Sequence, residues 1–466
     1  MKVKLLDSSK LISENEKEGE IPSFKKIVKD VFKIVWPAMV EGFLVALVSM
    51  FDGIQVAKLG NNATAAITLT KQPVFFMICF ITAINIAVTA IVARRKGAKD
   101  PENCNNTCHE AIKISFLFAI VLSIFVFVLS NPINLLMGAK QDTIDYANQY
   151  IRIISLGFVF NALRLTINAC QRGVGNTKVS MYTNVIANIV NITFNYLLIT
   201  GKFGFPRLEI KGAAIATVFG NFVAFVISFI SLIRSDEYLK FSTKKLFKKN
   251  RDANKNIFSL FPSTMIEQAV MRVGFILFAL IVNYLGTQAT YVHGVCNDIN
   301  VLAFTLADGF AIGTSAIVGH KLGEERKDLA IVYSKVSMML SVFFAILISV
   351  FLVVFREPLI LLYKPETTDL LNQAKYILLI AAVTTLPQTI QWVLTGILRG
   401  AGDTKFTATT SLISVTILRP TVSFVLCYLT PLGIIGAWIG MFIDQMIRLT
   451  LNIGRFKSRV WMETRV

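Results

Sequence analysis

Long apolar runs recur along the whole chain, and they constrain its fold more than any other feature. The run 336–355 contains no charged residue, and the run 116–129 is equally apolar. A helix of about 20 apolar residues crosses the roughly 30 Å hydrocarbon core of a bilayer. Backbone polar groups inside lipid must find partners within the protein, which favours helices. The sequence therefore predicts an all-α integral membrane protein, in keeping with its 54% of hydrophobic residues.

Twelve transmembrane helices can be placed on these runs. The ranges expected in the first half of the chain are 31–57, 63–93, 109–130, 145–171, 178–200 and 211–234. The ranges expected in the second half are 257–284, 288–318, 329–355, 373–398, 406–429 and 432–454.

The two halves repeat one another. The pairs that recur, each at an offset of about 226 residues, are Leu59-Gly60 with Leu285-Gly286, 172–178 with 399–405, and Gly212-Ala213 with Gly436-Ala437. An even number of helices per repeat returns the chain to the same side of the membrane. We therefore expect two homologous six-helix bundles, related by a pseudo-two-fold axis along the membrane normal, with a substrate cleft between them.

Charge divides the loops into two classes and predicts the topology. The net charge is +18, and Lys and Arg gather in alternate short loops, most densely in 244–255. This asymmetry is typical of a multi-pass protein of the cell (plasma or inner) membrane rather than of a nucleic-acid-binding protein, and it places both termini in the cytoplasm. The expected organisation is a cytoplasmic tail 1–30, a first bundle 31–240, a cytoplasmic linker 241–256, a second bundle 257–455 and a cytoplasmic tail 456–466.

Several acidic residues fall inside predicted helices, where a charge costs about 2.5–3.5 kcal/mol on insertion scales. Asp52 and Glu41 lie eleven residues apart, on one face of the first helix. Glu267 occupies the repeat position of Glu41, so we expect both carboxylates to approach the pseudo-two-fold axis. The eighth helix adds Asp298 and Asp308. Glu267, Asp298 and Asp308 are each either an ion or proton site or part of a structural ion pair with Arg272. The alternative for Glu41 is that it only reaches the cytoplasmic interface.

Amides form stripes on three predicted helices. The spacing of the stripe members is three or four residues, which places each set on one helical face. The sets are Asn184, Asn188, Asn191 and Asn195; Asn161, Arg164 and Asn168; and Thr384, Gln388, Gln391 and Thr395. Such a face turns toward protein or water rather than lipid, either lining a cleft or bonding between helices. Asp444 and Arg448, four residues apart, are expected to pair.

The chain shows no arrangement typical of an enzyme. The three His residues lie in loops or at helix ends, and no nucleophile accompanies a base. Cys104, Cys108 and His109 are close in sequence but lack a fourth ligand, so we expect no metal site. We expect no cofactor, and because no nucleotide-binding domain is visible in the sequence, the energy must come from an ion gradient or from the substrate itself.

A series of short motifs resembles the multidrug and toxic compound extrusion (MATE) family. The matching segments, in order, are 50–52, 58–60, 171–177, 191–199, 212–217 and 398–404, and the resemblance covers roughly residues 30 to 455. It implies a two-lobed antiporter that exports organic cations and other amphipathic compounds in exchange for Na+ or H+.

The resemblance also implies a set of ion-coupling residues. Asp52 matches the central acid of the family's first helix. The two residues of the fifth helix that assist this acid match Asn191 and Asn195. Position 195 is an acid in other members, whereas it is Asn in this chain. Glu267 is the nearest match to an acid of the seventh helix, and 384–398 contains no acid to match that of the tenth.

The sequence thus predicts a secondary active transporter that works by alternating access. Glu41, Asn184, Asn188, Asp298, Asp308, Gln388 and Gln391 are expected as possible cleft-lining residues. The partners would be a cationic or amphipathic small molecule and the lipid bilayer, with no nucleic acid and a monomeric state. A lipid-linked oligosaccharide flippase is the alternative. Such proteins tend to need a cationic cleft for pyrophosphate, and the predicted helices contain Arg164, Arg272 and Arg419. A membrane acyltransferase is a weaker alternative.

Overall fold

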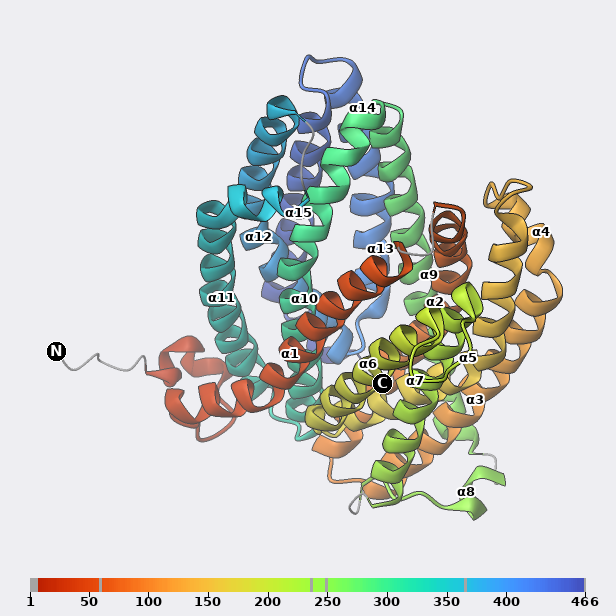
Figure 1. The fold of residues 1–466 in the computed structure, drawn as a ribbon. Coiled ribbons are helices and arrows are strands. Elements are labelled where there is room, and N and C mark those ends of the chain that lie inside the picture. Colours follow the sequence, from red (N-terminus) through yellow and green to blue (C-terminus); the bar gives the residue numbers. More distant parts are fainter. Residues whose placement is uncertain (1–6, 58–60, 235–237, 248–249, 364–366, 465–466) are drawn as a thin grey trace. The chain divides into compact units, whose positions relative to one another are not determined.

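The computed structural model describes residues 7–57, 61–234, 238–247, 250–363 and 367–464; for 47–57, 61, 62, 64, 246 and 247 it describes the backbone alone. Its regular structure in this part of the chain is entirely helical (Figure 1). The predicted all-α fold is therefore confirmed.

The first repeat contains six long helices, and they coincide with the six predicted ones. They are α1 (Phe24–Ala57), α2 (Asn61–Gly97), α3 (Pro101–Val128), α5 (Ile144–Gly173), α6 (Thr177–Thr200) and α7 (Glu209–Ile233). The short helices among them are η1 (Ser8–Leu11), η2 (Glu14–Glu16), α4 (Ser130–Leu136) and α8 (Thr243–Phe247).

The second repeat has the same plan. Its helices are α9 (Arg251–Asn283), α10 (Thr287–Gly323), α11 (Lys327–Leu361), α12 (Thr368–Gly400), α13 (Thr404–Ser411), η3 (Leu412–Leu418), α14 (Arg419–Tyr428), α15 (Ile434–Lys457) and η4 (Val460–Glu463). The π-helix η3 joins α13 to α14, so the three together replace the single helix predicted over 406–429.

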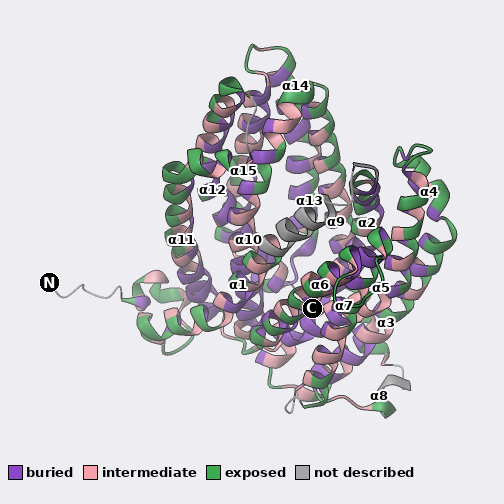
Figure 2. Cartoon of the chain, viewed as in Figure 1, coloured by how far each residue is buried: buried purple, intermediate pink, exposed green. Residues whose placement is uncertain are grey.

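Ten helices of the described chain are long and apolar enough to cross a membrane. Among them, α11 exposes an almost continuous apolar surface that includes Phe343, Leu347 and Val354 (Figure 2). A soluble protein rarely exposes so large an apolar patch. The long helices outside this group are α1 and α6, and in α6 the four Asn residues lower the hydropathy.

Packing within each repeat follows one pattern. α2 packs on α5 and α6 on α7 in the first repeat, just as α10 packs on α12 and α14 on α15 in the second. Equivalent glycines make equivalent contacts: a Cβ added to Gly212 would lie 2.7 Å from the carbonyl oxygen of Leu198, and one on Gly436 would lie 2.7 Å from that of Leu426. The repeat read from the sequence is thus present in the packing of the helices.

The repeated segments 172–178 and 399–405 span turns, as the sequence predicts, and 174–176 and 401–403 are their residues outside the helices. They connect α5 to α6 and α12 to α13. Gly175 and Gly402 have φ of +84° and +88°, the left-handed region that side chains other than glycine rarely adopt. This requirement explains why the glycine recurs in both halves.

The chain divides into two packing units, and the division falls inside α1 and α9. One unit, hereafter the N-terminal unit, contains 43–261; the other, the C-terminal unit, contains 1–42 and 262–466. The beginning of α1 therefore packs with the second repeat. The ranges predicted from the sequence describe the repeats, whereas these units describe packing.

Residues 7–23, which we call the N-terminal strap, pack on the C-terminal unit. Ile12 is buried in the same apolar core as Trp461 of η4. Glu18 accepts a hydrogen bond from the backbone N–H of Lys327 at 2.8 Å, and Arg459 lies 3.0 Å from Glu16. The strap thus connects the two ends of the chain with the start of α11.

Candidate functional site

The Asn stripe of α6 is divided between buried and partly exposed positions. Asn191 and Asn195 are buried, with 8% and 3% of their surface exposed, whereas Asn184 and Asn188 are half-buried. The buried Nδ2 of Asn188 has no hydrogen-bond partner in the described part of the protein. Asn191 and Asn195 therefore face protein, one of the two surroundings, protein or water, that the spacing predicts.

Asn191, Asn195 and Thr217 form a buried polar cluster between α6 and α7. Nδ2 of Asn191 donates to the hydroxyl of Thr217 at 3.2 Å, and Nδ2 of Asn195 donates to Oδ1 of Asn191 at 3.3 Å. The two helices approach closely here because position 220 is a glycine. A Cβ on Gly220 would lie only 2.8 Å from the carbonyl oxygen of Ala187. The cluster brings together the two amides that the family resemblance assigns to ion coupling.

Arg164 of α5 carries a buried positive charge that contacts the Asn stripe at Asn184. Its side chain donates to Oδ1 of Asn161 at 2.8 Å and also to Oδ1 of Asn184 on α6. Only 9% of Arg164 is exposed. The α5 stripe predicted from the sequence therefore acts in part as a link between α5 and α6.

A cavity of about 190 Å³ opens inside the N-terminal unit, between α2, α5 and α7. It is lined mainly by apolar side chains, with a few polar groups among them, as is usual for small-molecule sites. The lining residues are Thr70, Lys71, Val74, Phe75, Ile78, Tyr150, Ile154, Gly157, Phe158, Asn161, Thr217, Val218 and Asn221. Because Thr217 and Asn161 belong to this wall, the cavity adjoins both the Asn cluster and Arg164.

The structure describes the side chains of three predicted acids but not that of the predicted coupling acid, Asp52. Asp52 lies in α1, but its side chain falls outside the described residues. Glu41 is half-buried in α1, Asp308 is half-buried in α10, and Asp298 is exposed in α10. Their roles stay predictions.

Glu267 is held inside the C-terminal unit by an arginine. Its carboxylate is fully buried, accepts a hydrogen bond from Arg399 at 2.9 Å and another from the hydroxyl of Thr407 at 2.9 Å. A carboxylate sealed against an arginine of its own unit is not one of a pair of free acids at a cleft. That part of the prediction for Glu41 and Glu267 is wrong, whereas a coupling role of Glu267 is untested.

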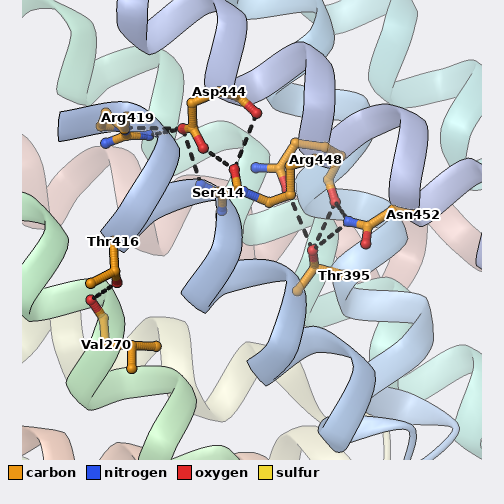
Figure 3. A network of polar contacts seen from close by, with 9 residues as sticks. Val270, Thr395, Ser414, Thr416, Arg419, Asp444, Arg448 and Asn452 are labelled. Atoms are coloured by element: carbon orange, nitrogen blue, oxygen red, sulfur yellow. Dashed lines mark hydrogen bonds and ion pairs between the residues drawn. The ribbon is translucent and has the colours of Figure 1, made fainter. Parts of the chain in front are cut away.

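A second buried ionic network surrounds Asp444 (Figure 3). Its carboxylate pairs with Arg448 at 3.3 Å, as the sequence predicts, and also accepts hydrogen bonds from Arg419 at 3.0 Å and from Ser414. Ser414 lies in the π-helix η3, and Thr416 of the same helix donates to the backbone oxygen of Val270 at 2.6 Å. π-Turns inside α-helices often accompany such specialised polar sites.

The α12 stripe is buried beside this network. Thr384, Gln388, Gln391 and Thr395 all have 5% or less of their surface exposed. Thr395 accepts a hydrogen bond from Asn452 of α15 at 3.1 Å, while Oε1 of Gln388 and Nε2 of Gln391 have no partner in the described part of the chain. The stripe therefore combines interhelical bonding with unsatisfied amide groups.

Three important residues of these sites were missed by reasoning from the sequence. Lys71 was not singled out, although it interrupts an apolar run. Arg399 was read only as part of a turn, and Arg419 was not connected with Asp444. Arg399 could have been noticed because it recurs as Arg172 in the first repeat. The sequence spacing of Arg419 and Asp444 gives no indication of their contact.

Comparison with known proteins identifies the family. The family model MatE matches residues 37–197 and 263–425, which together make up more than half of the chain. The chain belongs to the MatE family. Its two matched segments are the two repeats described above, so the family architecture and the internal repeat coincide.

Curated relatives of this MatE protein span nearly its whole length. A probable multidrug resistance protein NorM from Thermotoga maritima is 26% identical over 95% of this chain and 94% of its own. The uncharacterized transporter YisQ from Bacillus subtilis is 23% identical over 93% of this chain and 95% of its own.

Solved structures share the fold. An outward-facing multidrug resistance MATE family transporter matches with a TM-score of 0.87 and 20% identity, over 94% of this chain and 97% of its own. A MOP superfamily transporter from Pyrococcus furiosus, described with a reverse polarity of its binding pocket, matches with a TM-score of 0.87 and 19% identity, also over 94% and 97%. The fold is thus that of MATE transporters, and the protein is a multi-pass membrane transporter.

Proposed function

We propose that this chain exports small amphipathic compounds in exchange for Na+ or H+, and that Asp52 is its coupling acid. The observation that carries the proposal is the apolar cavity of the N-terminal unit, whose wall shares Thr217 with the buried Asn191–Asn195 cluster. Relatives named as probable multidrug resistance proteins support a small-molecule substrate. A ligand cavity next to an ion-binding cluster is what an exchanger needs, because ion and substrate must influence one another's binding.

Polar groups of the cluster suit a weakly held cation. Carboxylate and amide oxygens replace the hydration shell of Na+, and a carboxylate alone can instead carry a proton. Asp52 would supply the charge, while Asn191 and Asn195 would orient the site. The absence of an acid at position 195 leaves Asp52 as the exchangeable charge of this set.

Purified protein in liposomes tests this proposal. A fluorescent amphipathic substrate is loaded, and Na+ and H+ gradients are imposed separately. We expect efflux to follow one of the two gradients, and efflux that follows neither contradicts the proposal. The flippase alternative gains no support from the family match or from the relatives above, and we do not retain it.

We also propose that both termini and the linker lie in the cytoplasm. Lys244 in α8 and Phe203 in the loop after α6 are both exposed, and they fall on opposite sides of the membrane in this topology. After replacement of the natural cysteines, Phe203→Cys should react with a membrane-impermeant thiol reagent in intact cells. Lys244→Cys should react only after permeabilisation. The reverse pattern would invert the topology.

A further inference from the structure

Lys71 places a positive charge in the wall of the N-terminal cavity. It lies in α2, inside the candidate span Ala65–Gly97, and it lines the cavity with its side chain exposed. Among the described residues, none forms an ion pair or a hydrogen bond with its ammonium group. An ionisable residue within a membrane span is costly, so an unpaired one points to a function.

The other polar groups of the wall add hydrogen-bond donors. Oδ1 of Asn161 accepts from Arg164 at 2.8 Å, which fixes the orientation of this amide and leaves its Nδ2 as a donor. Asn221 is half-buried, and its amide forms no hydrogen bond with any described residue. The hydroxyl of Thr217 already donates to Ala213 at 3.0 Å.

The charges of the described lining residues then favour an anionic ligand. The described lining residues include one cation and no carboxylate, and the guanidinium of Arg164 adds a second positive charge behind Asn161. The rest of the wall, such as Val74, Phe75 and Phe158, is apolar. A cavity of about 150 Å³ already takes benzene, so this larger one can hold an aromatic or aliphatic body of similar or somewhat greater size.

We propose that the N-terminal cavity binds an amphipathic organic anion, with its carboxylate on Lys71 and the amide donors of Asn161 and Asn221 and its apolar body against α2 and α5. Lys71 is thus a residue that determines specificity. The inference rests on the proposed function in taking this cavity as a substrate site, and it narrows the substrate class from amphipathic compounds in general.

Equilibrium binding of two matched fluorescent probes to the purified full-length protein tests the inference. The probes, 2-naphthoate and 2-naphthylmethylammonium, share an apolar body and differ in the sign of their charge. We expect the anion to bind more tightly than the cation. Lys71→Met should weaken 2-naphthoate binding about tenfold, the loss expected for one charge-assisted hydrogen bond. Lys71→Arg should largely restore it.

Lys178→Met is the matched control, because Lys178 is also exposed in the same unit but does not line the cavity. It should leave the affinity for both probes unchanged. Tighter binding of the cation, equal loss in both lysine variants, or no binding of 2-naphthoate by the folded wild-type protein would each overturn the inference. The assay needs no ion gradient, so its outcome is independent of whether transport is coupled to Na+ or H+.

Discussion

Individual residues in the C-terminal unit show how the protein keeps charges inside a membrane. Asp444 has two guanidinium groups and a hydroxyl around it, and Glu267 has one guanidinium and one hydroxyl. Burying a charge is tolerable only when it is paired and hydrogen-bonded. These acids are thus satisfied in place, whereas Lys71 has no ionic partner among the residues whose side chains are described.

Asp444→Asn should strongly destabilise the protein, because it leaves Arg419 and Arg448 buried without their counter-charge. Breaking a buried pair in this way costs about 3–5 kcal/mol. Thermal unfolding in detergent, followed by tryptophan fluorescence, measures the change. Asp369→Asn, at an exposed position in α12, should change stability by less than about 0.5 kcal/mol. Equal melting temperatures for the two variants would contradict the structural role of Asp444.

Reasoning from the sequence found contacts within a helix but not those between distant segments. The pair Asp444–Arg448 was predicted because four residues make one turn. Arg272 was one candidate partner of Glu267, whereas the structure pairs Glu267 with Arg399 in the last turn of α12. Such a contact depends on how helices pack, and a single sequence does not contain that information.

Elements were predicted more completely than contacts. Each long helix coincides with a predicted one, because about 20 apolar residues leave no alternative structure in lipid. Many helices extend beyond the apolar run. For example, α3 begins at Pro101 rather than at 109, because Asp100 caps its N-terminus by accepting a hydrogen bond from the backbone N–H of Asn103 at 3.1 Å. The π-helix η3 was not predicted, since it depends on the partners of Ser414 and Thr416 in neighbouring helices.

The N-terminal strap gives a prediction at the same scale. The hydrogen bond from Ser13 and the adjacent Arg459 hold the pKa of Glu16 below its ordinary value of 4.5. Because the pKa of Glu16 is lowered, its charged contact stabilises the strap at pH values above 4.5. This stabilisation is lost as the pH falls through the lowered pKa. Glu16→Gln should therefore speed hydrogen exchange of 7–23 about two- to fivefold at neutral pH, as expected for a surface ion pair.

Lys457→Ala, at an exposed position of α15, serves as the control for the strap. It should leave exchange in 7–23 unchanged. After correction for intrinsic exchange rates, the difference between Glu16→Gln and wild type should vanish in acid. A difference that persists well below pH 4.5 would show that the charge of Glu16 is not what holds the strap.

At the scale of the whole molecule, the sequence predicted the family architecture through its repeat, and the comparisons and the packing of equivalent helices agree with it. It predicted an organic cation or other amphipathic compound as substrate. The cavity of the N-terminal unit, with Lys71 in its wall, leads us to an anionic one. The polarity of a cavity depends on which helix faces meet, so it could be judged only once the helices were assembled.

The proposed exchange depends most on Asp52 as the charge that couples an ion gradient to export. The direct test is efflux from liposomes by Asp52→Asn, which removes the charge while nearly preserving the volume, with folding checked by thermal unfolding. We predict that the variant folds and still binds substrate, while gradient-driven efflux falls to that of protein-free liposomes. Near-normal, gradient-dependent efflux by the folded variant would contradict the account.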